Sequence, residues 1–144
     1  MLRHCSCVIA LAVMLVGLPT AQAADTTLTL ACQGTATDIT QPVDGKPEPV
    51  SMGIIINFTA GTVTSGSKGA LLGWDFPVKI TSFDEAAVLF EGSYDTELTV
   101  RTISGNIDRV TGDMKAVSTK MNKNTFISLD VAYFLKCKPT QRMF

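Results

Sequence analysis

The sequence predicts an all-β fold: an antiparallel meander of about eight short strands that closes into a small barrel or a sandwich. Apolar and polar residues alternate along most segments, and no window of about 11 residues carries a convincing helical stripe. Turn-forming residues separate the alternating segments at short intervals. Two cysteines fall on the apolar faces of the first and last alternating segments, which indicates that these two strands are neighbours.

The first 23 residues have the pattern of a cleaved secretory signal peptide. Arg3 and His4 give a basic start, residues 8–18 form an apolar run, and residues 21–23 (Ala-Gln-Ala) match a small–x–small cleavage site. The apolar run is shorter than the roughly 20 residues that a membrane-spanning helix needs. We therefore expect a single mature domain, residues 24–144, that is exported to the periplasm or secreted and has no membrane span.

The mature domain lacks the side chains on which much enzyme chemistry depends. The chain has 12 Lys and Arg, 13 Asp and Glu and one His. Because Arg3 and His4 lie in the signal peptide, the mature domain keeps an acidic excess and no histidine. This excludes Ser-His-Asp and Cys-His nucleophiles and histidine-based zinc or copper sites, and the acidic balance argues against nucleic-acid binding. We therefore expect no enzyme activity, no cofactor and no nucleic-acid partner.

One catalytic alternative remains, a hydrolase that uses a pair of carboxylates. Asp84, Glu85, Glu91 and Asp95 lie close together in sequence, with Tyr94 among them. Glycoside hydrolysis needs two carboxyl groups at a set separation. Acidic residues in turns and on strand surfaces give the same pattern, so we rank this alternative below a binding role.

Cys32 and Cys137 are expected to form a disulfide that joins the first and last strands. Cys5 and Cys7 are lost with the signal peptide, and a single remaining pair in an oxidising compartment predicts a bridge. Cys32 shares its face with Leu30, and Cys137 ends the apolar face of the last segment. The bridge closes a loop of about a hundred residues, which the chain-entropy model equates with about 4–5 kcal/mol. The wide spacing argues against a redox-active pair.

Strand and turn patterns alternate between the two cysteines. Residues 51–58 are apolar on both faces for part of their length, which predicts a strand covered on both sides. Residues 37–50 hold three of the six prolines and few apolar residues, so we expect a surface loop there. A hairpin is predicted around Asp84 and Glu85, and two longer strands flank residues 108–112.

Asp108, Arg109, Thr111 and Gly112 are predicted to form a hairpin turn rather than a metal site. A calcium loop of the EF-hand type needs oxygen ligands two and four positions after its first aspartate. Val110 and Gly112 stand there and offer none. Asp108 is expected to accept backbone N–H bonds as an Asx-turn residue, with Arg109 or Lys115 nearby as its counter-charge.

Trp74, Asp75 and Phe76 are the best candidates for a binding contact, with Tyr94 as a fourth. Trp74 is the only tryptophan and follows a glycine-rich connection. A tryptophan on such a loop can line a barrel mouth or meet a partner. The alternative, which we favour for Trp74 itself, is that its side chain plugs one end of the core.

Three patterns occur together in the mature domain: L-x-C-x-G (Leu30, Cys32, Gly34), S-G-x-I-D-R-x-T-G (residues 104–112) and Y-x-L-x-C-x-P (Tyr133, Leu135, Cys137, Pro139). In this combination the chain resembles a group of small exported proteins of rhizobia-like alphaproteobacteria. The resemblance covers most of the mature domain. It implies a bacterial, periplasmic protein and supplies no catalytic residue.

The chain also shows a weaker similarity to MliC-type periplasmic inhibitors of C-type lysozyme. These are small barrels in which an early cysteine and a C-terminal cysteine can be joined. Their S-G-x-x-Y loop enters the lysozyme site, whereas residues 91–95 of this chain (EGSYD) place Tyr94 at a different spacing. We expect a binding or structural protein that meets a protein partner. Lysozyme inhibition and the carriage of a small apolar ligand are the alternatives.

Overall fold

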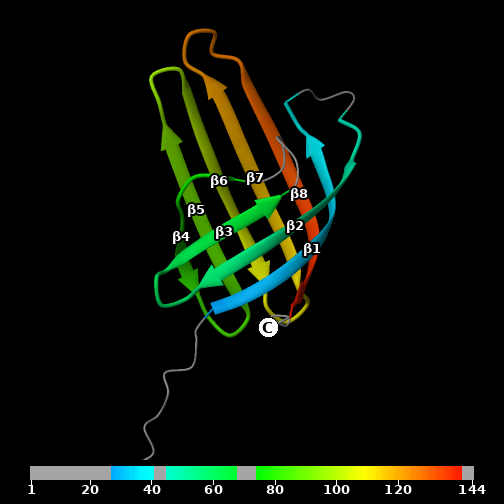
Figure 1. The fold of residues 1–144 in the computed structure, drawn as a ribbon. Helices are drawn as coiled ribbons and strands as arrows, with labels where there is room; N and C mark the ends of the chain where they lie inside the picture. The colour runs from blue at the N-terminus through cyan, green and yellow to red at the C-terminus, as the bar shows by residue number, and fades with distance from the viewer. Residues whose placement is uncertain (1–26, 41–44, 68–73, 141–144) are drawn as a thin grey trace, which may run out of the picture.

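The chain forms a closed antiparallel β-barrel in which every strand pairs with its sequence neighbour and the first strand pairs with the last (Figure 1). A computed structural model describes residues 27–40, 45–67 and 74–140. The described part of the chain contains no helix that could cross a bilayer. The all-β prediction is confirmed, and the closed strand order makes the architecture a barrel rather than a sandwich. The predicted signal peptide, residues 1–23, lies outside the described residues.

The eight strands follow one another as an up-and-down meander. They are β1 (Thr27–Asp38), β2 (Glu48–Asn57), β3 (Thr62–Ser67), β4 (Val78–Phe83), β5 (Ala87–Asp95), β6 (Thr99–Asp108), β7 (Asp113–Asn122) and β8 (Ser128–Pro139). The surface loop predicted over residues 37–50 is shorter than expected. β1 continues through Asp38 and β2 begins at Glu48, because these residues pair across the β1–β8 and β1–β2 ladders.

Alternation along each strand separates the core from the solvent. Ile54 and Ile56 are fully buried, whereas Ile55 between them is 45% exposed. The strand over residues 51–58 is therefore covered on one side only, and the prediction of two covered sides is wrong, because no second layer of described residues packs on the outside of this strand. Inside, Phe90 on β5 faces Gly105 on β6, and a Cβ atom at Gly105 would lie 2.8 Å from the Phe90 ring. The glycine makes room for the aromatic ring.

The predicted disulfide closes the barrel. Cys32 on β1 and Cys137 on β8 are direct partners in the ladder register, with Cα atoms 4.0 Å apart, and their sulfurs are bonded. Both side chains are buried among the apolar residues of the core. The cysteines of the first and last strands thus lie side by side, as the face pattern of the two strands indicates.

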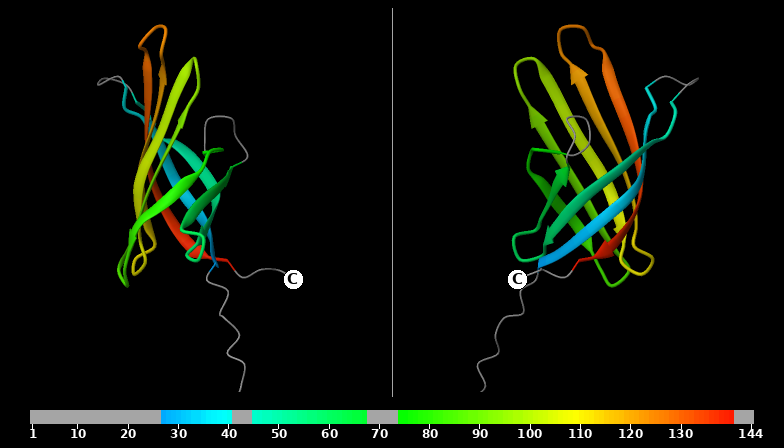
Figure 2. Two further views of the ribbon diagram at one scale, coloured as in Figure 1. Left: turned by 90° about the vertical axis from the view of Figure 1, so that its left-hand side faces the viewer. Right: turned by 45° about the vertical axis from the view of Figure 1, so that its right-hand side comes forward.

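The two ends of the barrel differ (Figures 1 and 2). We call the end that holds the starts of β1, β3, β5 and β7 the base, and the opposite end the rim. The β2–β3, β4–β5 and β6–β7 turns lie at the base. At the rim, β5–β8 extend beyond the ends of β3 and β4 as a four-stranded wall (Figure 2).

The residues predicted to form a hairpin turn connect β6 with β7 at the base. The Oδ1 atom of Asp108 accepts the backbone N–H groups of Val110 and Thr111, each at 2.8 Å, in an Asx turn. Arg109 is not the counter-charge of Asp108: it donates to the carbonyl of Asp84. Gly112 adopts a positive φ of 77°, and its carbonyl accepts the N–H of Cys137. The turn is therefore attached to the strand that carries the disulfide.

Two glycine substitutions should separate backbone strain from steric clash. Gly61 and Gly112 both have positive φ, but a Cβ atom at Gly61 meets nothing within 4 Å, whereas one at Gly112 would lie 2.4 Å from the Cys137 carbonyl oxygen. We expect Gly61→Ala to cost about 1 kcal/mol and Gly112→Ala at least about 2 kcal/mol more, measured by urea unfolding. Equal losses in the two variants would show that the β6–β7 turn is not held against β8.

Acid should weaken the fold as the turn carboxylates are protonated. The backbone N–H groups of Thr111 and Val110 hold the pKa of Asp108 below the ordinary aspartate value of 3.8. The pKa of Asp84 is lowered in the same way by its own turn. A group with a lowered folded-state pKa stabilises the fold above its unfolded pKa, and the contribution is lost as the pH falls through the folded pKa. We therefore expect the urea midpoint to be flat from neutral pH to about pH 5 and to fall below about pH 4.

The variant Asp108→Asn provides the control for this pH dependence. Its amide keeps an acceptor oxygen for the Asx turn but does not titrate. The urea midpoint of the variant should therefore fall less steeply with acid than that of the wild type. A midpoint that rises on acidification, or identical slopes in the two proteins, would contradict the assignment of the acid sensitivity to this turn.

Candidate functional site

The four residues that the sequence singled out as contacts lie together at the rim. Trp74, Asp75 and Phe76 precede β4, and Tyr94 lies next to the end of β5. The rings of Phe76 and Tyr94 stack with their centroids 6.3 Å apart. Trp74 and Phe76 are buried, whereas Tyr94 is 47% exposed and the Asp75 side chain 80% exposed. Two of the four residues therefore support the site, and two present it to solvent.

Trp74 is a core residue that closes the weakest seam of the barrel. The β3–β4 ladder contains only two residue pairs among the described residues, and Pro77, which lacks an N–H donor, precedes the strand. Beyond those pairs Trp74 links the two segments by hydrogen bonds. Its backbone N–H donates to Ser65 Oγ at 2.9 Å, and its indole N–H donates to the Val63 carbonyl at 3.4 Å. The structure places Trp74 in the core at the seam, only 4% exposed.

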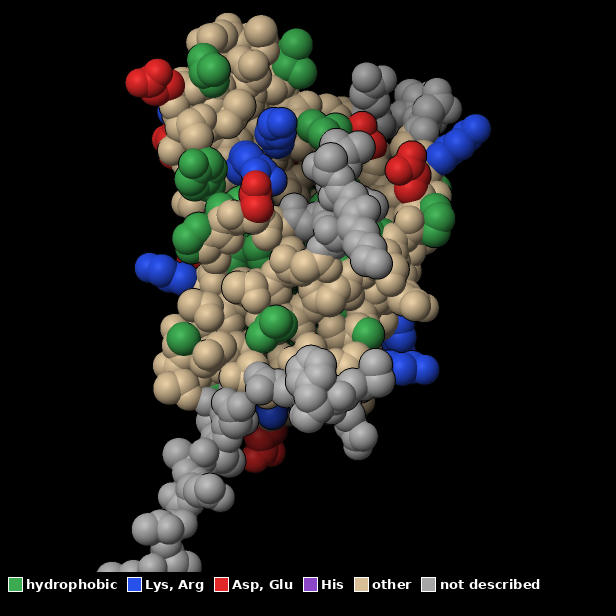
Figure 3. Space-filling view, viewed as in Figure 1, with side chains coloured by type: hydrophobic (Ala, Val, Ile, Leu, Met, Phe, Trp, Pro, Cys, Tyr) green, Lys and Arg blue, Asp and Glu red, His purple; other side chains and the backbone are tan. Residues whose placement is uncertain are grey.

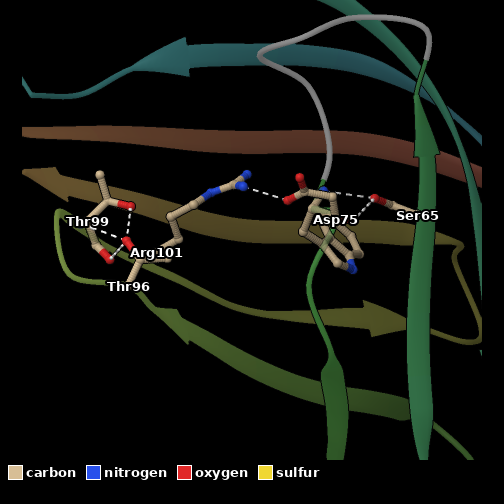
Figure 4. A network of polar contacts seen from close by, with 6 residues as sticks. Ser65, Asp75, Thr96, Thr99 and Arg101 are labelled. Atoms are coloured by element: carbon tan, nitrogen blue, oxygen red, sulfur yellow. Dashed lines mark hydrogen bonds and ion pairs between the residues drawn. The ribbon is translucent and has the colours of Figure 1, made fainter.

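Arg101 belongs to the site, although the sequence analysis did not single it out. It is the direct ladder partner of Tyr94, and its guanidinium lies over the Phe76 ring, 5.2 Å from the centroid. It also forms an ion pair with Asp75 (Figure 4). Arg101 occupies the same face of β6 as buried Ile103, so an arginine in the apolar phase of a strand was the signal that could have identified it.

A second cation faces Arg101 across the β6–β7 ladder. Lys120 on β7 is the direct partner of Arg101, and both lie on the inner face of the wall. Below them Tyr133 is buried, and this burial raises the pKa of its hydroxyl, against a smaller opposing effect of the Arg101 charge. Figure 3 shows basic side chains beside an acidic one on the upper half of the molecule. Arg101 and Lys120 thus place two positive charges on the inner face at the rim, and Asp75 pairs with the first of them.

Apolar side chains project from the two hairpin tips beside this cluster. Leu98, Phe126 and Ile127 are all more than half exposed. The backbone N–H of Lys123 donates to the Leu98 carbonyl at 2.9 Å, and the Lys123 side chain pairs with Asp95, so the tips are held against each other. Phe126 has a φ of 54°, which is unusual for a bulky residue. Phe126 thus combines an unusual backbone conformation with a side chain that is 78% exposed.

The carboxylates that lie close in sequence do not form one site. Asp84 is in the β4–β5 turn at the base, whereas Asp95 ends β5 at the rim. Across the described ranges, no three His, Cys, Asp or Glu side chains gather as metal ligands.

Two grooves lie on the described surface. One of about 490 Å³ lies beside Trp74 and Asp75. Another of about 640 Å³ crosses β4–β6 and is bordered by hydroxyl groups such as those of Ser93 and Thr102.

Comparison of the chain with protein families, curated proteins and solved structures gives no match. The arrangement at the rim offers an exposed tyrosine, a guanidinium over an aromatic ring, an exposed carboxylate paired with that guanidinium, and apolar hairpin tips. These groups suit the binding of another molecule by contact.

Substitutions at Trp74 and Tyr94 should separate support from contact. Trp74→Ala removes a buried side chain that also bonds β3, and we expect a loss of about 3–5 kcal/mol in the free energy of unfolding. Tyr94→Ala removes a half-exposed ring, and the loss should stay within about 1 kcal/mol. Both values are measured by urea unfolding with the disulfide intact. A Trp74→Ala loss as small as that of Tyr94→Ala would contradict the core position of Trp74.

Proposed function

We propose that this protein is an exported, non-enzymatic binding domain that contacts a protein partner through the rim of its barrel. The layered cluster at the rim carries the proposal: exposed Tyr94 and Asp75 rest on buried Phe76 and Trp74. Tyrosine, tryptophan and arginine dominate the energetics of protein interfaces when packing holds them in place. The cluster has both that composition and that support.

The rigidity of the barrel favours this role. Tyr94 and Arg101 are adjacent residues on two paired strands, so little side-chain and backbone freedom is lost when they are contacted. The apolar hairpin tips, Leu98 and Phe126 among them, extend the exposed surface at the same end. Large exposed apolar side chains that gather at one place are typical of interaction sites.

Export is part of the proposal and has three supports. Residues 1–23 carry the secretory pattern, the Cys32–Cys137 disulfide is compatible with an oxidising compartment, and the motifs around it resemble those of exported proteins.

Carriage of a small apolar ligand is the weaker alternative. Interior positions of the barrel carry large buried side chains, among them Phe90, Met114 and Tyr133. Side chains of this size fill the interior of an eight-stranded barrel, which favours contact at the surface over enclosure of a ligand.

C-type lysozyme is the first partner to test. The similarity to its periplasmic inhibitors rests on a small barrel with an early and a late cysteine joined, and Tyr94 of the E-G-S-Y-D segment lies exposed at the rim. Binding of lysozyme by the wild-type protein, lost in Tyr94→Ser, would identify the partner class.

Native mass spectrometry of protein purified from the periplasm of its own host tests the proposal without prior choice of a partner. We expect a chain that starts at Ala24, two hydrogens lighter than the reduced form, with the mass of a bound protein. Tyr94→Ser should lose the bound mass. Phe134→Ser, which changes an exposed aromatic on the outer face of β8, should keep it. Retention of the partner in Tyr94→Ser, or a small bound apolar molecule in its place, would overturn the proposal.

A further inference from the structure

We propose that Arg101 and Lys120 form a receptor for a carboxylate group of an acidic segment in the partner. The inference rests on the proposed function, because it names the chemistry that the rim recognises. It is drawn from the register of β6 and β7, the support of the Arg101 guanidinium and the state of the neighbouring charges.

The two cations are placed where they repel each other. Arg101 and Lys120 are direct partners in the β6–β7 ladder, on the inner face of the wall at the rim. Like charges directly opposite each other on neighbouring strands destabilise a sheet. A bound anion between them would relieve this repulsion, so the pair has an energetic preference for a negatively charged ligand.

Arg101 is held ready for such a ligand. Its guanidinium lies over the ring of Phe76, which is itself buried and stacked against Tyr94. The Arg101 side chain is 28% exposed, so it stays accessible to solvent while its guanidinium lies against the ring. A planar guanidinium has five donors and matches the two oxygens of a carboxylate.

Asp75 shows which anion the site accepts. Its carboxylate already pairs with Arg101, which demonstrates that the guanidinium takes a carboxylate from the solvent side. The Asp75 side chain is 80% exposed, and exposed ion pairs of this kind contribute little to stability. A carboxylate of the partner can therefore share Arg101 with Asp75 or replace it at small cost.

Lys120 supplies a positive charge that no other described residue neutralises. The structure pairs Lys123 with Asp95 and Lys136 with Asp113, but it gives Lys120 no ion pair among the residues that it describes. The exposed ring of Tyr94 lies next to Arg101 on the neighbouring strand and offers a face for an apolar residue of the same segment. The ligand is therefore an acidic peptide segment with an apolar neighbour beside the carboxylate.

A titration followed by two-dimensional NMR tests the proposal with defined probes. The acidic probe is an end-capped pentapeptide with two glutamates and one leucine, and the matched control peptide carries glutamines. At low salt, the glutamate peptide should shift the amides of Tyr94, Arg101 and Lys120, and the glutamine peptide should not. Inorganic phosphate provides a further arm, because a site built for phosphate would bind it more tightly than the peptide, and that result would overturn the carboxylate assignment.

Four variants locate the binding. Lys120→Gln and Arg101→Lys should each weaken peptide binding about tenfold, the effect of one lost charge-assisted hydrogen bond. Arg101→Lys keeps the positive charge but loses the planar guanidinium that can donate two parallel hydrogen bonds to a carboxylate. Its effect therefore tests the geometry of binding rather than charge alone. Asp75→Asn should strengthen binding several-fold by removing the competing carboxylate. Lys136→Gln, at the base, should leave binding unchanged. Equal weakening in Lys136→Gln, or no change in Asp75→Asn, would overturn the proposal.

The failure of this inference can be distinguished from the failure of the proposed function. If a protein partner is bound and Tyr94→Ser releases it, but the glutamate peptide produces no shifts at Arg101 and Lys120, the carboxylate receptor is wrong and the binding role stands. If the peptide binds at these residues with the expected variant pattern, the receptor is supported on evidence that does not involve the native partner.

Discussion

Pairing between β1 and β8 turns a row of hairpins into a barrel with an inside. Before these strands meet, each hairpin can bury only one of its faces, and the interior positions of β1 and β8 face solvent. The Cys32–Cys137 bridge lies within this pairing, where the two residues are direct partners. It links residues 105 positions apart, so in the chain-entropy model it restricts the unfolded chain more than a bridge across a short loop would. The seam between the ends of the chain is thereby the best secured one in the barrel.

The bridged strand β8 also anchors the β6–β7 turn at the base of the barrel. Hydrogen bonds hold the β6–β7 turn in place. The Gly112 carbonyl accepts the N–H of Cys137, and the Asp108 carboxylate accepts two backbone N–H groups within the turn. The most specific of the three sequence patterns, I-D-R-x-T-G, is thus explained by structure: an Asx turn, a glycine with positive φ and a contact to the bridged strand. Local hydrogen bonds therefore fix this turn at the base of the barrel.

Much of the fold could be predicted from the sequence because alternation is a local property. The faces of β1 and β8 placed both cysteines inward. The turn residues Asp84 and Glu85, and those of residues 108–112, marked two of the hairpins. The choice between barrel and sandwich could not be made, since it depends on whether β1 meets β8 along its whole length. The exposure of Ile55 was missed because a short apolar run does not reveal whether a second layer exists. For the site, Trp74, Asp75, Phe76 and Tyr94 were found by residue type, but Arg101 emerged only from the β5–β6 register.

The β3–β4 seam has a consequence for how the molecule can be observed. Among the described residues this seam has two ladder pairs, a hydrogen bond from the Ile80 N–H to the Gly61 carbonyl, and the hydrogen bonds made by Trp74. The β1–β8 seam is instead held by a long ladder and a covalent bond. Trp74 is the only tryptophan of the chain, and it lies in that weak joint with its indole packed against Phe90. Its fluorescence therefore reports the state of one wall rather than an average over the barrel. Trp74 is therefore an intrinsic fluorescent probe of the seam that has the shortest ladder among the described residues.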